Sequence, residues 1–224
     1  YRRAEFHKQS GNETAANNSL ETATELFAEL SDTHSNIVAG ISAMLGRGMA
    51  QAMAGNHEEA LEAFENVLQV RPEPAVAIFR FQAAYEKAGS LSALERYEEA
   101  VDTLRDIAGE FRSMPPALEI SLRMRYARTL QAAGEQELKQ AEEKQANAEQ
   151  LRAQGRAGEA EQLVREIGPH RRRAQVMYSR AVEQVRYIAQ ADVPESREAQ
   201  RLLGALLEVP GLDDVAGPTD LFAR

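Results

Sequence analysis

The chain has 224 residues, of which 43% are hydrophobic and 27% are charged, and its formal net charge at pH 7 is −9. This composition is ordinary for a folded protein and argues against wholesale disorder, while the acidic balance argues against nucleic acid as the main partner. Because the sequence contains no cysteine, disulfide frameworks, cysteine metal sites and thiol nucleophiles are excluded.

Apolar residues recur with the period of an α-helix along almost the whole chain, and no sustained alternation predicts a strand. The tail at 210–224 contains Gly and Pro and is predicted to be irregular. The longest uncharged run, Ser35 to Gly46, is far shorter than the roughly 20 apolar residues of a membrane helix, so we expect no membrane insertion. The predicted helices cover residues 1–10, 19–32, 36–54, 57–70, 74–89, 94–112, 116–153, 159–190 and 196–208.

Residues 44–72 carry small, aromatic and proline residues at regular offsets. Gly48 and Ala60 would let two helices approach closely, Phe64 would fill the space behind them, and Pro72 would end the second helix. This pattern resembles the tetratricopeptide repeat, a pair of antiparallel helices of about 34 residues. At the positions where the family has Trp, Leu and Tyr, the chain instead carries Met44, Arg47 and Gln51.

The same pattern recurs after this pair of helices. Residues 78–89 predict a first helix and residues 97–107 a second one, with Ala100 and Leu104 in the core positions of the second helix. Ser90 to Glu95 is interpreted as an insertion between the two helices.

Weaker copies of the pattern lie at both ends of the repeat region. Ala23, Phe27 and Leu30 occupy second-helix positions near the N-terminus, and residues 118–134 predict a further first helix. The resemblance implies a right-handed α-solenoid of about three to four tetratricopeptide-like hairpins. We expect it to form a single domain over residues 1–209.

One segment departs from the repeat. After Gly134 the helical pattern continues without a break as far as Ala153, turns at Gly155 to Gly158, and returns with apolar residues at coiled-coil-like spacing. This predicts a long antiparallel helical arm at about residues 135–173, with a kink or break at Gly168-Pro169. The alternative is that the same segment forms another degenerate repeat.

The sequence predicts no catalytic, cofactor or metal site, and the chain is not expected to be an enzyme. The helix that starts at His57 begins like a zinc-protease motif, but Leu61 stands where the second His would be. No phosphate-binding loop or nucleophile elbow is present. The histidines are scattered beside predicted turns or termini, at His7, His34, His57 and His170.

The resemblance implies a protein or peptide partner, because the first helices of stacked hairpins line a concave groove that commonly receives one. A methionine-rich groove suits an apolar or helical segment, although these residues would be core if a neighbouring helix covers them. The expected lining is Ser42, Leu45, Met49 and Met53, then Val76, Phe79 and Ala83, and then Ser121, Met124, Arg128 and Gln131.

An alternative function is assembly, in which the arm mediates homo-oligomerisation or docks into a larger complex. The size of the exposed apolar area in the groove and along the arm would discriminate the two functions. The absence of cysteine is compatible with a cytoplasmic and with an exported, periplasmic location.

Overall fold

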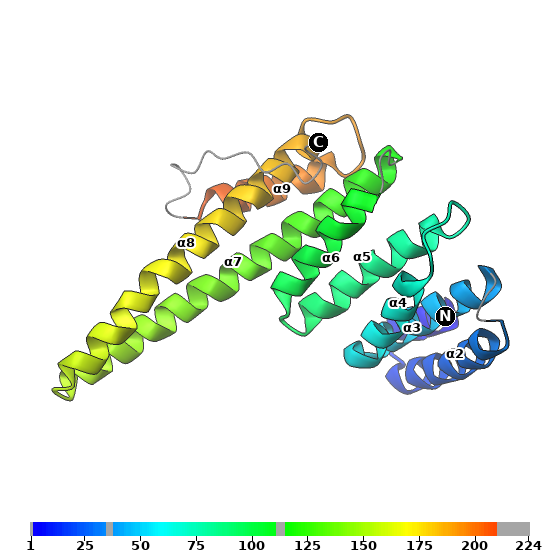
Figure 1. Cartoon of the computed structure of the whole chain (residues 1–224), viewed down its shortest axis with the longest axis horizontal. Coiled ribbons are helices and arrows are strands. Elements are labelled where there is room, and N and C mark those ends of the chain that lie inside the picture. Colours follow the sequence, from blue (N-terminus) through cyan, green and yellow to red (C-terminus); the bar gives the residue numbers. More distant parts are fainter. Residues whose placement is uncertain (1, 35–37, 111–114, 210–224) are drawn as a thin grey trace. The chain divides into compact units, whose positions relative to one another are not determined.

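A computed structural model describes residues 2–34, 38–110 and 115–209 (Figure 1). In these residues every regular element is an α-helix, which confirms the predicted all-α class. The tail predicted at 210–224 lies outside the described residues. The helices are α1 (Arg2–Gln9), α2 (Glu13–His34), α3 (Val38–Ala54), α4 (His57–Gln69), α5 (Ala77–Ala93), α6 (Tyr97–Glu110), α7 (Pro116–Ala153), α8 (Ala157–Ala189) and α9 (Ser196–Leu207).

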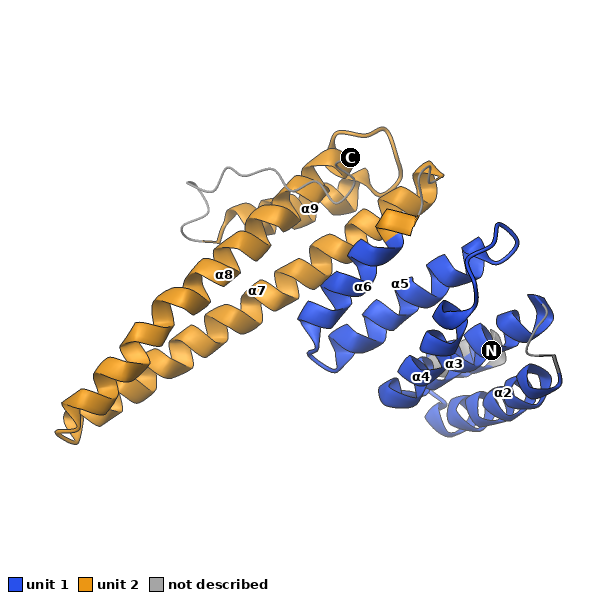
Figure 2. Ribbon diagram, in the orientation of Figure 1, with its two compact units in different colours: residues 1–107 blue, residues 108–224 orange. Residues whose placement is uncertain are grey.

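The chain divides into two compact units, residues 1–107 and residues 108–224 (Figure 2). Unit 1 contains α1 to α5 and most of α6, and unit 2 contains α7 to α9. The single domain expected over 1–209 therefore stays a prediction.

In unit 1 successive helices pack on one another: α1 on α2, α2 on α3, α3 on α4, and α4 on α5. The core positions predicted from the repeat pattern are confirmed, since Ala60, Phe64, Ala100 and Leu104 are all fully buried. Close helix contact depends on glycine, because a Cβ atom on Gly46 would lie 2.8 Å from the ring of Phe27. The core cluster joining α3, α4 and α5 is Ile41, Leu45, Ala60, Phe64, Val67, Val76 and Ala83.

The C-terminal end of α4 is held by a buried arginine of α5. The Arg80 guanidinium donates a hydrogen bond to the carbonyl oxygen of Val70 at 2.7 Å, and a second one to that of Leu68. The last carbonyls of a helix have no partner within the helix, so a buried end needs such donors. Arg80 thereby connects α4 to α5.

Two helix boundaries in unit 1 differ most from the prediction. α2 begins at Glu13 and not at residue 19, because Asn12 Oδ1 accepts the backbone N–H of Ala15 at 3.1 Å and caps the helix. The insertion predicted at Ser90 to Glu95 is wrong, since α5 continues to Ala93 and ends where Glu95 takes a φ of 58°.

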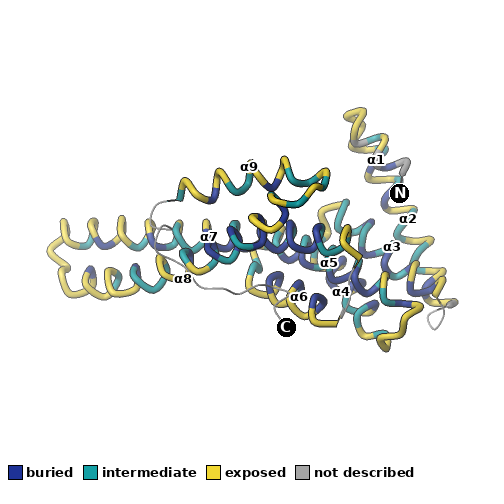
Figure 3. The backbone as a smooth tube through the Cα atoms, turned by 90° about the horizontal axis from the view of Figure 1, so that it is seen from above, coloured by how far each residue is buried: buried dark blue, intermediate teal, exposed yellow. Residues whose placement is uncertain are grey.

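Unit 2 is built on one long antiparallel hairpin, α7 and α8, against which α9 packs. The turn lies at Gly155, whose φ of 78° suits glycine. Of the kink or break predicted at Gly168-Pro169, the break is wrong, because α8 is continuous through Pro169, and the kink stays a prediction. In the arm (residues 135–173) the outer sides are exposed, and a narrow buried stripe lies between the helices (Figure 3). That stripe is Ala141, Ala148, Ala160 and Ile167.

Candidate protein-interaction surface

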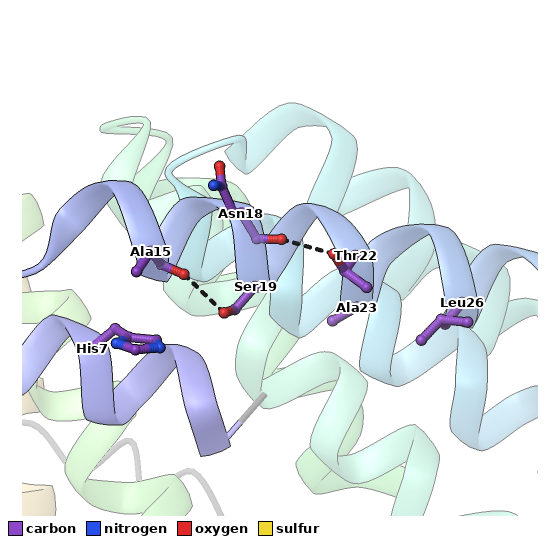
Figure 4. A pocket seen from close by; sticks show the side chains of 7 residues that line it. All are labelled: His7, Ala15, Asn18, Ser19, Thr22, Ala23 and Leu26. Carbon is purple, nitrogen blue, oxygen red and sulfur yellow. Dashed lines mark hydrogen bonds between the residues drawn. The ribbon is translucent and has the colours of Figure 1, made fainter.

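A pocket of about 420 Å³ lies along α2 where it packs beside α1 (Figure 4). α1 contributes a single residue to the wall, and successive turns of α2 contribute the rest. Figure 4 shows α1 beside the part of α2 that carries Ala15 and Ser19, while Ala23 and Leu26 continue the wall along α2. The lining residues are His7, Ala15, Asn18, Ser19, Thr22, Ala23 and Leu26.

The hydroxyl groups in this wall are bonded to the helix itself. Ser19 Oγ donates to the carbonyl oxygen of Ala15 at 2.8 Å, and Thr22 Oγ1 donates to that of Asn18 at 2.9 Å. A hydroxyl that is satisfied by the preceding turn no longer needs a partner from a ligand. The wall therefore presents mainly carbon to whatever enters the pocket.

Large apolar side chains extend the wall along α2. Leu26 is 61% exposed and Leu30 is 41% exposed, one helical turn apart. Leu30, which was placed at a second-helix position of the repeat, is therefore not part of the core. A single exposed leucine needs no explanation, but two adjacent ones beside a pocket form a patch of the kind that marks interaction sites. On α1, exposed Phe6 contacts the ring of His7 edge to face, with centroids 5.7 Å apart.

Acidic side chains run beside the leucines on the solvent side of α2. Among the side chains that the structure describes, no lysine or arginine pairs with them. Two of them, Glu21 and Glu25, also line a second pocket of about 430 Å³, together with Gln51 and Asn56. The exposed acidic residues are Glu21, Glu25, Glu29 and Asp32.

The groove expected on α3 and α5 is largely filled. Leu45, Val76 and Ala83 belong to the core cluster and cannot line an open surface, because they pack with Phe64 between the helices. Of the others, Ser42 is exposed, and the half-buried residues are Met49, Met53 and Phe79.

Partners inside unit 1 account for two of these half-buried residues. Gln82 Nε2 lies 3.7 Å from Met49 Sδ. Met53 packs against the cluster of Ala4, Leu20 and Ala50. Both methionines therefore contribute to packing within the unit.

The remaining four expected groove residues lie on α7, in unit 2. Met124 is buried and so cannot line a groove, while Ser121 and Gln131 are half-buried. Arg128 is exposed and forms an ion pair with Glu198 of α9. Arg128 is therefore already paired with α9 within unit 2.

A charged cluster connects the two helices of the arm. Arg173 Nε donates to Glu137 Oε1 at 2.9 Å, and His170 Nδ1 lies 2.6 Å from Glu137 Oε2. Burial raises the pKa of Glu137, but the hydrogen bonds from Arg173 and His170 outweigh it and hold that pKa below its ordinary value. Every member of the cluster bonds across the hairpin, so it fixes the pairing of α7 with α8.

Within the part of the chain that the structure describes, no helix has the length and apolarity needed to cross a membrane. In the same residues, no three His, Asp or Glu side chains gather closely enough to hold a metal ion. No family model, curated protein or solved structure matches the chain.

Proposed function

We propose that this chain is a protein-interaction scaffold that binds a segment of another protein. The observation that carries the proposal is the pocket on α2, with Leu26 and Leu30 exposed along its continuation. Apolar side chains beside a carbon-lined pocket gain free energy when a partner removes them from water.

The same proposal interprets unit 1 as tetratricopeptide-like hairpins stacked into a short right-handed α-solenoid. Two observations support it: α1 to α5 pack on one another in chain order, and the small and large core residues fall at the offsets of the repeat. Such stacks serve mainly as binding surfaces.

The surface proposed for binding is on α2 and differs from the groove expected on the first helices. Because Leu45, Val76 and Ala83 are core residues, a partner in the expected groove would find almost none of their apolar area to cover. Leu26 and Leu30 offer more exposed apolar surface than these three residues together.

Site-specific photo-crosslinking tests the proposal. A photoreactive amino acid at Leu26, in the cells that make the protein, should give a discrete adduct with another polypeptide. The same amino acid at Leu207, a 55% exposed leucine of α9, is the matched control and should give none. An adduct at Ser42 of α3, an exposed residue of the expected groove, in place of Leu26 would return the site to that groove. No adduct at any of the three positions would contradict the scaffold function.

A second candidate function is assembly through the arm. The observation that favours it is an exposed valine of the arm, Val164 at 39%, with a second exposed valine, Val176 at 43%, just beyond the arm on α8. If this function holds, the double variant Val164→Asp, Val176→Asp should lower the sedimentation coefficient of the purified protein. Sedimentation as a monomer before and after the change would count against self-association.

A further inference from the structure

We infer that the occupant of the α2 surface is a cationic amphipathic helix of another protein. This inference rests on the proposed scaffold function and adds the conformation and charge of the partner.

The first argument is continuity with the packing of α1. α1 packs on α2, and Ala4 and Leu20 are buried close together. α1 has 8 residues and α2 has 22, so at 1.5 Å per residue they span roughly 12 Å and 33 Å. The pocket begins at His7 of α1 and continues along α2 to Leu26. A helix that prolongs the line of α1 would fill this pocket and cover Leu26 and Leu30.

The second argument concerns the shape of the surface. Ala15, Ser19 and Ala23 follow one another at one-turn spacing along the pocket, so they form a shallow groove of small side chains with Leu26 at its end. Helices pack by fitting a ridge of side chains into such a groove. An extended segment would leave its backbone N–H and C=O groups facing apolar side chains, whereas a helix satisfies its own backbone hydrogen bonds.

The third argument is charge. Glu25 and Glu29 directly precede Leu26 and Leu30, so each carboxylate lies about 100° around the helix from its leucine. A helix docked on the leucines would therefore bring one flank next to Glu25 and Glu29. Lysine or arginine on that flank would be attracted, and acidic residues there would be repelled.

The test uses synthetic helical peptides of about 14 residues, long enough for roughly four turns. The first peptide has a leucine stripe flanked by lysine, the second has the same stripe flanked by glutamate, and the third keeps the lysines but replaces the leucines with serine. Binding to the whole chain is measured by fluorescence anisotropy. The lysine-flanked leucine peptide should bind about tenfold or more tightly than either of the others.

Reversing the charges on α2 tests the charge of the partner more directly than the peptides alone. The double variant Glu25→Lys, Glu29→Lys should reverse the preference, so that the glutamate-flanked peptide binds more tightly. Glu59→Lys, Glu62→Lys changes two exposed residues of α4 in the same way and should leave the preference as it was. Leu26→Asp should abolish binding of every peptide, and circular dichroism should show an unchanged helical content because Leu26 is exposed.

The outcomes separate this inference from the function on which it rests. If the peptide preference is the same in the Glu25→Lys, Glu29→Lys variant as in the wild type, the inference that the partner helix is cationic is wrong. A partner crosslinked at Leu26 without any peptide binding also overturns it, yet leaves the scaffold function standing. A dimer in sedimentation that Leu26→Asp dissociates would make a second copy of the chain the occupant and overturn the inference. If no peptide binds and no adduct forms at any crosslinking position, the scaffold function is contradicted as well.

Discussion

Gly48 of α3 lies directly against the ring of Phe64 of α4: a Cβ atom on Gly48 would stand 2.5 Å from Phe64 Cε1 and 2.7 Å from Cδ1. Phe64 itself is fully buried. The two helices therefore approach to a distance that only glycine allows. The contact between Gly48 and Phe64 therefore sets the spacing of α3 and α4, and the stability of unit 1 depends on it.

Gly48→Ala should destabilise the chain by about 1–3 kcal/mol, because the added methyl group overpacks the core and the ring of Phe64 cannot move into free space. Urea denaturation measures the change. Gly204→Ala in α9 is the control: no atom lies within 4 Å of the added carbon, so the better helix propensity of Ala should stabilise by up to about 1 kcal/mol. Equal effects of the two substitutions would contradict the close contact.

Phe64→Ala should cost roughly 3–5 kcal/mol, as truncation of a large core side chain does. The substitution removes a ring that is 0% exposed, and the neighbouring helices cannot close the cavity fully. Phe6→Ala, at a residue that is 66% exposed, is the matched control and should change stability by less than about 0.5 kcal/mol. A loss below about 1 kcal/mol for Phe64→Ala would mean that the repeat register is wrong.

Glu137→Gln should destabilise the protein by roughly 1 kcal/mol at pH 7, since the carboxylate side chain is only 13% exposed and bonds Arg173 and His170. The pKa of Glu137 is held below its ordinary value of 4.5. The contribution of the charged carboxylate is therefore present above pH 4.5 and is lost as the pH falls through the lowered pKa.

Denaturation of wild type and variant at a series of pH values checks this prediction. The difference between them should hold at neutral pH and shrink under acid conditions. Glu143→Gln, an exposed position on the same helix, should show no difference at any pH. A gap between wild type and Glu137→Gln that widens as the pH is lowered would contradict the ion pair.

Replacing residues 141–169 with a short Gly/Ser turn should leave a cooperative thermal transition within a few degrees of wild type. The removed part of the arm buries little beyond four residues that pack on each other, and Glu137 keeps both His170 and Arg173. A repeat inside the stack would behave differently, because its deletion removes two interfaces.

Circular dichroism measures the transition of the arm deletion. Tyr178→Ala supplies the comparison, since Tyr178 is 3% exposed and its ring lies 3.0 Å from where a Cβ atom on Gly134 would be. That substitution should lower the transition far more than the deletion does. Loss of the cooperative transition in the deletion would favour the degenerate repeat.

Most helices could be predicted from the sequence because their apolar periodicity and their breaks agree. Gly55 and Gly155 both adopt positive φ in the breaks between predicted helices, where glycine commonly ends a helix. Gly89 misled the prediction: Leu91, two residues further on, is 1% exposed, and its burial keeps α5 helical past the glycine. α5 in fact ends at Ala93, and the turn that follows it at Glu95 has no sequence signature, because a glutamate seldom takes a positive φ.

The candidate surface was harder to predict. Burial of Leu45, Val76 and Ala83 depends on how α3, α4 and α5 meet, which periodicity on a single helix does not reveal. The exposure of Leu30 has the same cause. A signal was nevertheless present, since Leu26 and Leu30 lie one turn apart, away from the stripe of Leu20 and Phe27. A second apolar stripe on one helix indicates a second neighbour.

The turn at the tip of the α7 and α8 hairpin has a practical use. Gly155 is exposed, has no atom within 4 Å of an added Cβ, and is followed by exposed Arg156. Such loop tips tolerate inserted sequence well. A short epitope or a fluorophore-binding tag placed between these two residues would give an internal handle for immobilisation and imaging, with both chain ends and the α2 surface left native.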